Sequence, residues 1–88
     1  MLFMAIFTYD PEKREAVIKR RAEKGLLTTA KVIGEWGAIA GCRVFRVVEA
    51  DDPMVLLAAS MAWGDLGQVE IIPIMTSEDI IKAAASKK

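Results

Sequence analysis

Arg46 is the residue in this sequence best suited to hold a charged ligand. It stands between Val44 and Val48 in an apolar run typical of a central β-strand, where charged side chains seldom lack a partner. A hairpin turn at 38–41 would place Glu35 on the same face, one pairing step away diagonally. Two interpretations remain open. Either the two residues form a buried or dimer-spanning ion pair, or Arg46 binds the carboxylate or enolate oxygen of a ligand in a bidentate manner.

The assumed turn decides which side chains share a face of the sheet. It pairs Gly37 with Cys42 and places Ile33, Glu35, Cys42, Val44, Arg46 and Val48 on one face. The other face then carries Val32, Gly34, Trp36, Arg43, Phe45, Val47 and Glu49. A turn one residue longer or shorter would reverse the second strand relative to the first.

Two tryptophans are the next candidates. Trp63 falls near the end of a predicted helix, off its main apolar stripe, where it would serve in packing, in a dimer contact or as a pocket wall. If the register brings them together, Glu35 and Arg46 would orient a ligand, and Trp36 and Trp63 would form walls of its cleft. The candidate ligand-binding residues are therefore Glu35, Trp36, Arg46 and Trp63, and no catalytic residue is identified.

Three further side chains have a chemical interpretation beside an ordinary structural one. Tyr9, at the end of the first strand, carries the only phenol. Asp65 follows a helix, where it would cap the loop or act as a base, and capping is the favoured interpretation. Cys42 is adjacent to Arg43, but neighbouring strand residues point to opposite faces, which favours inert packing over a reactive thiolate.

The composition excludes several classes of function. The chain has 88 residues, 12 basic and 12 acidic side chains, no histidine and one cysteine. Without histidine we expect no metal site and no Ser-His or Cys-His nucleophile, and we expect no cofactor. Zero net charge argues against nucleic-acid and membrane-surface partners. A single cysteine and the lack of a leader or spanning segment favour a cytoplasmic location.

The pattern of elements predicts an α+β fold. Strands are expected at 2–9, 30–37, 42–50 and 68–75, and helices at 11–24, 53–63 and 77–85. Asp10-Pro11 and Asp52-Pro53 would each open a helix and divide the chain into two similar halves. This βαββαβ order predicts one ferredoxin-like domain over 1–88, with an antiparallel sheet of order 4-1-3-2, both main helices on one face and a C-terminal helix.

The apolar content of 53% exceeds what so short a chain can bury. The first strand is apolar on both faces, and Met54, Leu57, Ala58, Met61 and Ala62 form the stripe by which the second helix is expected to pack. Two helices cover only one sheet face, so the other needs a cover. We expect a homodimer packed sheet against sheet, whose terminal helix could reach across to the partner. The alternative is that this helix folds back over its own sheet.

The sequence also resembles a known family. The segments that carry the resemblance are MLFMAIFTY at 1–9, DPEKR at 10–14, GEW at 34–36, RVFRVVEADDP at 43–53, WGDL at 63–66 and IIPIM at 71–75. Together they resemble a family of short stand-alone prokaryotic proteins catalogued only as a domain of unknown function. The resemblance implies a dimeric α+β barrel, in a superfamily that includes cofactor-independent monooxygenases, muconolactone-isomerase-like enzymes and dehydratases. Many of those enzymes use a pocket histidine, which this chain lacks.

Three functions are compatible with the sequence. The favoured one is binding of a small apolar or acidic molecule in a helix–sheet cleft of a homodimer, which would need a cavity of about 300 Å³ or more. The enzymatic alternative is a cofactor-independent monooxygenase or isomerase. The third is a non-catalytic structural or regulatory dimerisation module.

Overall fold

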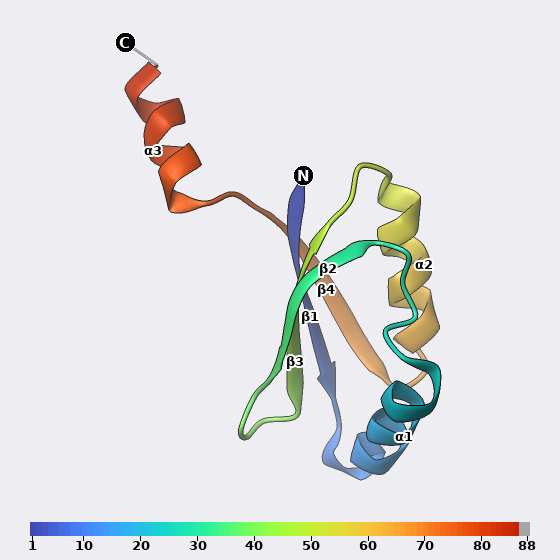
Figure 1. Cartoon of the computed structure of the whole chain (residues 1–88). Helices are drawn as coiled ribbons and strands as arrows, with labels where there is room; N and C mark the ends of the chain where they lie inside the picture. Colours follow the sequence, from blue (N-terminus) through green and yellow to red (C-terminus); the bar gives the residue numbers. More distant parts are fainter. Residues whose placement is uncertain (87–88) are drawn as a thin grey trace.

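An antiparallel four-stranded sheet carries two helices on one face, and a third helix projects from its end (Figure 1). The computed structural model describes residues 1–86. The strands are β1 (Leu2–Tyr9), β2 (Lys31–Gly37), β3 (Arg43–Glu49) and β4 (Gly67–Ile74). The helices are α1 (Arg14–Lys24), α2 (Pro53–Trp63) and α3 (Ser77–Ser86), and a short 3-10 turn, η1 (Pro11–Lys13), precedes α1.

The sheet has the topology predicted from the sequence. Its strand order is β2-β3-β1-β4, which is the expected order 4-1-3-2 read from the opposite edge. The fold is therefore ferredoxin-like. Strand β4 lies at an edge, as Pro73 requires, because proline has no N–H to donate to a second neighbour.

The two Asp-Pro sequences begin their helices differently. Asp52 caps α2, since its Oδ1 accepts a hydrogen bond of 2.9 Å from the backbone N–H of Met54. The same role expected for Asp10 is wrong: its side chain caps nothing, and its backbone carbonyl instead closes the 3-10 turn by accepting from the N–H of Lys13. Helix α1 ends at Gly25, whose φ of 73° suits glycine.

Helix α2 packs by the opposite face from the one expected. Its buried residues are Leu56 and Trp63, whereas Met54, Leu57 and Met61 of the predicted inward stripe are exposed. Nearly every position of this helix is apolar, so its periodicity does not distinguish an inner from an outer face. Packing of Trp63 into the core sets the rotation of the helix instead.

The β2–β3 hairpin differs from the expected register by two residues. Gly37 lies opposite Val44 rather than Cys42, and this even shift keeps Glu35 and Arg46 on one face. It also places those two residues directly opposite each other instead of diagonally. A bulge at residue 33 brings Val32 opposite Val48, so Val32 shares the Arg46 face, contrary to the prediction.

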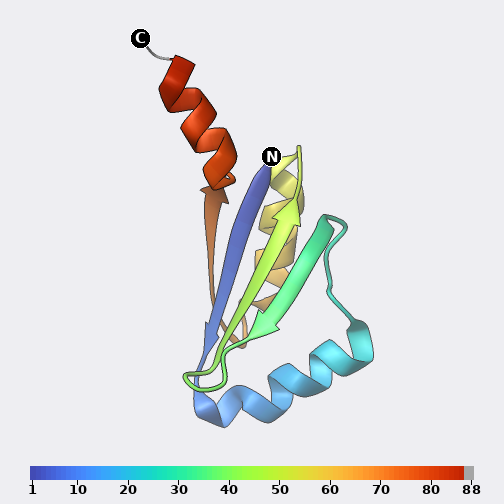
Figure 2. The same ribbon diagram turned by 60° about the vertical axis from the view of Figure 1, so that its left-hand side comes forward.

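Helix α3 stands away from the rest of the molecule. Figures 1 and 2 show it continuing upward from the end of β4, and every one of its ten residues is exposed. It does not fold back over its own sheet. The sheet face opposite α1 and α2 is therefore uncovered in the single chain (Figure 2).

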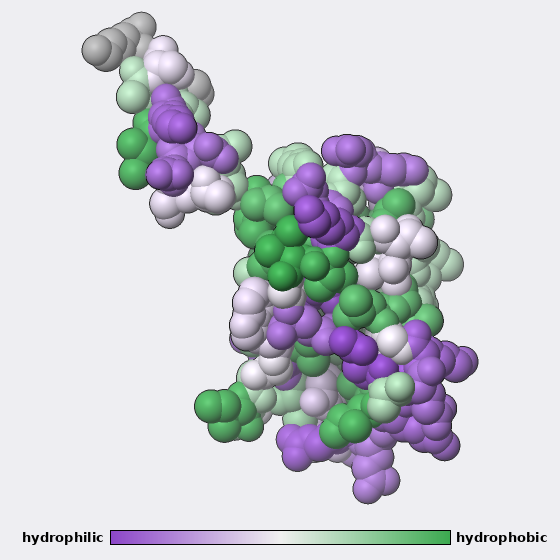
Figure 3. Space-filling model, viewed as in Figure 1, coloured by the Kyte–Doolittle hydropathy of each residue, from purple (hydrophilic) through white to green (hydrophobic). Residues whose placement is uncertain are grey.

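That uncovered face, which we call the open face, is largely apolar. The pairing register places Leu2, Met4, Ile6, Trp36, Phe45, Val47, Ile72 and Ile74 on it. Figure 3 shows a large apolar patch next to the base of α3. Exposure of such a continuous apolar surface to water is unfavourable, and the patch is larger than the scattered apolar residues of an ordinary protein surface.

Candidate functional site

An apolar cleft lies between the sheet and the two helices. Its walls include Ala5 and Phe7 of β1, Val44 and Val48 of β3, Ile71 of β4 and Leu56 of α2. Its volume is about 110 Å³, so the expected cavity of about 300 Å³ or more, the size of sites for drug-sized molecules, is not present here. An engineered apolar cavity of roughly 150 Å³ is known to hold benzene. The cleft therefore suits a ligand of about one ring or less.

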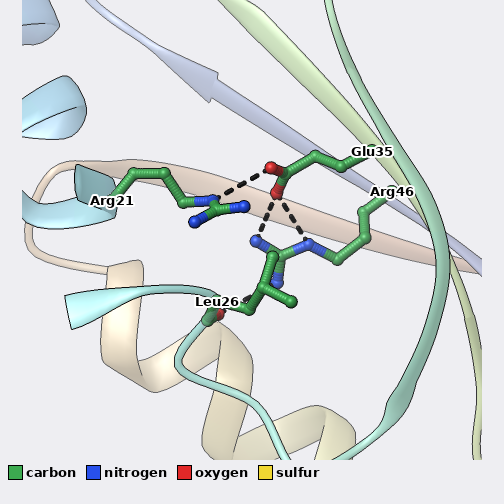
Figure 4. A network of polar contacts seen from close by, with 4 residues as sticks. All are labelled: Arg21, Leu26, Glu35 and Arg46. Carbon is green, nitrogen blue, oxygen red and sulfur yellow. Dashed lines mark hydrogen bonds and ion pairs between the residues drawn. The ribbon is translucent and has the colours of Figure 1, made fainter.

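The ion pair proposed from the sequence is present at this cleft. Arg46 is 13% exposed and Glu35 is 21% exposed. Glu35 Oε2 accepts hydrogen bonds from Arg46 Nη2 at 2.6 Å and from Arg46 Nε at 3.0 Å. Arg46 Nη1 also donates to the backbone carbonyl of Leu26 at 3.2 Å, which ties β3 to the loop after α1 (Figure 4).

A second arginine, which the sequence analysis missed, completes the cluster. Arg21 of α1 donates from Nε to Glu35 Oε1 at 3.0 Å, so two guanidinium groups approach one carboxylate (Figure 4). The sequence does contain a signal for Arg21, because this residue follows Val17, the buried residue of α1, by one helical turn and so lies on the same face of the helix. We call Arg21, Glu35 and Arg46 the Arg–Glu–Arg cluster. Among residues 1–86, these three are the charged side chains that line the cleft.

The cluster holds Glu35 in its ionised form. Burial alone would raise the pKa of Glu35, but hydrogen bonds from Arg46 and Arg21 outweigh that effect and hold the pKa below its ordinary value. Two guanidinium groups and one carboxylate leave the cluster with one positive charge in excess. The mouth of an otherwise apolar cleft is therefore electropositive.

Trp63 lines the cleft on the side next to the hydrophobic core. The side chain is 6% exposed, packs with Val17 and Leu66, and its ring centroid lies 5.6 Å from that of Phe7. Its indole Nε1 is buried and has no hydrogen-bond partner among the described residues. The Arg20 guanidinium lies 5.7 Å from the ring centroid.

Trp36 does not belong to this set. It pairs with Phe45 on the open face, opposite the cleft, and its exposed fraction is 57%. The ring covers Gly34, where a Cβ would collide with it. The expectation that Trp36 walls the cleft together with Glu35 and Arg46 is therefore not met, because alternation along β2 directs Glu35 and Trp36 to opposite faces.

The remaining candidates lie outside the cleft. Asp65 neither caps its loop nor stands free as a base, because both of its oxygens accept hydrogen bonds of 2.7 Å from Arg20. This contact with Arg20 lowers the pKa of Asp65 to about 2. Cys42 lies in the hairpin turn, before β3 rather than in it, and its Sγ is 3.3 Å from Nη2 of Arg14. Tyr9 packs at the edge of the hydrophobic core.

Comparison with known proteins identifies the family. The model of a domain of unknown function, DUF3303, matches residues 1–88. The chain belongs to the DUF3303 family. No similar protein was found among those with curated descriptions.

Two further observations describe this DUF3303 member. Within residues 1–86, no three carboxylate or cysteine side chains lie close enough together to hold a metal ion. No helix in the same part of the chain is long and apolar enough to cross a bilayer.

Proposed function

We propose that this protein binds a small carboxylic acid in the helix–sheet cleft. The observation that carries the proposal is the combination of an apolar cleft with a cluster that has one positive charge in excess. An apolar body would replace water against Phe7, Val48 and Ile71, and the carboxylate would stay at the electropositive mouth.

Arg21 is the residue that would contact the carboxylate. Of its five N–H groups, only Nε–H donates a hydrogen bond within the described residues, so its two terminal nitrogens remain available. Its side chain is 44% exposed, which gives a ligand access to it. Arg46, which is more deeply buried, would hold Glu35 in place, and Glu35 in turn would orient Arg21.

The cleft size narrows the class of ligand. Short-chain fatty acids and single-ring acids such as benzoate are of suitable size, since a volume of about 110 Å³ leaves no room for a second ring. Larger substrates of the kind that fill pockets of about 300 Å³ or more do not fit.

Binding is favoured over catalysis because of the state of Glu35. A general base works best with a pKa near the operating pH, and the pKa of Glu35 is lowered instead. Glu35 is the one carboxylate among the described residues that line the cleft. No observation favours the monooxygenase or isomerase alternative.

We further propose that the protein is a homodimer packed through its open faces, which would give the dimeric α+β barrel. The open face is apolar along the middle of β1 and β3, Arg43 and Glu49 of β3 lie on it at opposite ends, and Glu70 lies on it in the edge strand β4. A two-fold axis running across the strands would bring Arg43 of each copy near Glu49 of the other, so in that arrangement these two charges are complementary. Helix α3, which needs a surface to pack against, would lie on the second copy.

The charge of the ligand provides the test of binding. Benzoate and benzylamine share a ring but differ in charge, so benzoate should raise the melting temperature and benzylamine should not. The Arg21→Gln variant should lose most of the benzoate effect. Lys19→Gln is the matched control, because it removes the same charge from an exposed position of the same helix. Equal responses to the two ligands would reject the proposal.

A further inference from the structure

We infer that Asp65 is a positioning residue for the carboxylate site. By holding Arg20, it fixes helix α1 against the end of α2 and so keeps Arg21, the next residue of the helix, at the mouth of the cleft. This inference rests on the proposed function and adds to that site a residue that lies outside the cleft.

Helix α1 has little apolar contact to hold it in place. Val17 is its one buried residue, and Ile18, its other large apolar side chain, is 59% exposed. A helix of eleven residues is also marginal in water on its own. The position of α1 therefore depends on the polar contacts that its arginine side chains make with other elements.

The contact made by Arg20 is the most extensive of these. Arg20 Nη1 and Nη2 donate to different oxygens of Asp65, each at 2.7 Å, and Nη1 also donates to the backbone carbonyl of Ala62 at 3.0 Å. Such a paired contact between a guanidinium and a carboxylate fixes direction as well as distance. Asp65 is itself held in place, because Trp63 before it and Leu66 after it are buried in the hydrophobic core.

Arg21 shares the backbone of α1 with Arg20, so a shift of the helix moves both residues. Within residues 1–86, Arg21 makes one hydrogen bond, from Nε to Glu35 Oε1. A single bond from a side chain that is 44% exposed holds the helix less firmly than the three bonds of Arg20. Loss of the contact between Arg20 and Asp65 should therefore move Arg21 away from Glu35 and from a bound carboxylate.

Two substitutions break this contact in different ways. Asp65→Asn removes a negative charge, which by electrostatics alone would make the mouth of the cleft more positive and tighten the binding of benzoate. Arg20→Lys keeps the charge of α1 and removes the paired geometry. If Asp65 positions Arg21, calorimetric titration should instead show that both variants bind benzoate about fivefold more weakly, which is the effect of losing one hydrogen bond.

Two further variants are controls for charge. Glu23→Gln removes the same charge from an exposed residue of α1, and it should leave the affinity for benzoate unchanged or slightly higher. Asp65→Glu keeps a carboxylate for Arg20 and should retain most of the affinity. Asparagine has the shape of aspartate and the Asp65 side chain is 62% exposed, so Asp65→Asn should fold. Should it not fold, Arg20→Lys provides the same test.

The Nε–H resonances of the free proteins give a readout that a loss of stability alone would not change. In Asp65→Asn the Arg21 resonance should shift, because its bond to Glu35 is weakened. The Arg46 resonance should shift much less, because the sheet holds Arg46 directly opposite Glu35.

The inference and the proposed function fail separately. Unchanged or tighter binding of benzoate by both Asp65→Asn and Arg20→Lys would overturn the inference and leave the carboxylate site in place. Equal weakening by Glu23→Gln, or equal shifts of the Arg21 and Arg46 resonances, would also overturn it. If the unmodified protein does not bind benzoate, the proposed function fails, and the resonances of free Asp65→Asn still decide whether Asp65 positions Arg21.

Discussion

Arg46 and Glu35 lie directly opposite each other on β3 and β2, with 2.6 Å between Arg46 Nη2 and Glu35 Oε2. A side chain on a third element, Arg21 of α1, contacts the other oxygen of the same carboxylate. The cluster thereby connects the sheet to the first helix at the mouth of the cleft. Its partly buried charges make it sensitive to both substitution and pH.

Replacing Arg46 by methionine should lower the free energy of unfolding by about 2 kcal/mol, because Glu35 would lose its more buried partner. The double variant Arg46→Met with Glu35→Met should recover much of that loss, since no unpaired carboxylate remains in the cleft. Urea denaturation of the two single variants, the double variant and the unmodified protein measures these effects. Simple addition of the two single effects would show that the residues are not coupled.

Stability should fall in acid because of Glu35. Its pKa is lowered in the folded state, so on acidification the unfolded chain takes up the proton first. The contribution of the Glu35 carboxylate to the free energy of unfolding is therefore complete above pH 4.5, the ordinary pKa of this group. As the pH falls through the folded-state pKa, the contribution is lost. Urea midpoints between pH 7 and pH 2 should therefore decline less steeply for Glu35→Gln. A parallel decline in the two proteins would contradict this account of the cluster.

Substitution on the open face should separate the proposed dimer. Trp36→Glu introduces a charge there, whereas Ile18→Glu introduces the same charge on α1 at a residue of similar exposure, 59% against 57%. Sedimentation should show a monomer for the first variant and a dimer for the second. A stable monomer of the unmodified protein at any accessible concentration would reject the face-to-face arrangement.

Helix α3 should be stable only in the dimer. A ten-residue helix is marginal in water on its own, and Ile80 and Ile81 are exposed in the single chain. Replacing both isoleucines by serine should raise the dissociation constant of the dimer at least about tenfold. Backbone chemical shifts of 77–86 should also lose their helical character as the unmodified protein is diluted. Shifts that stay helical and independent of concentration would show that α3 needs no partner.

The placement of Arg46 and Glu35 on one face was predictable because it depends only on the parity of the hairpin, whereas their direct pairing depends on the exact length of the turn. The true turn differs from the expected one by two residues, which leaves every side chain of β3 on its predicted face. The bulge at residue 33 was not predicted, although Gly34 beside it is the kind of strand glycine that often marks a bulge, and it moved Val32 to the other face.

The rotation of α2 and the contact between Arg21 and Glu35 could not be derived from the sequence. In a helix that is apolar on nearly all sides the periodicity does not mark the buried face, and here that face contains Leu56 and Trp63. Arg21 reaches Glu35 only because the loop after α1 sets the distance of the helix from the sheet, and loop geometry of that kind has no periodic signal. The contact between Asp65 and Arg20 could not be derived either, because the two residues are 45 positions apart in the sequence.

The most direct test of the carboxylate site is a titration of the unmodified protein with benzoate, followed through the Nε–H resonances of its arginines. The account predicts saturable shifts of the Arg21 and Arg46 signals with one binding constant, while the Arg20 signal stays unchanged because Asp65 holds that side chain outside the cleft. Shifts that are linear in benzoate, or equal for all three arginines, would contradict it.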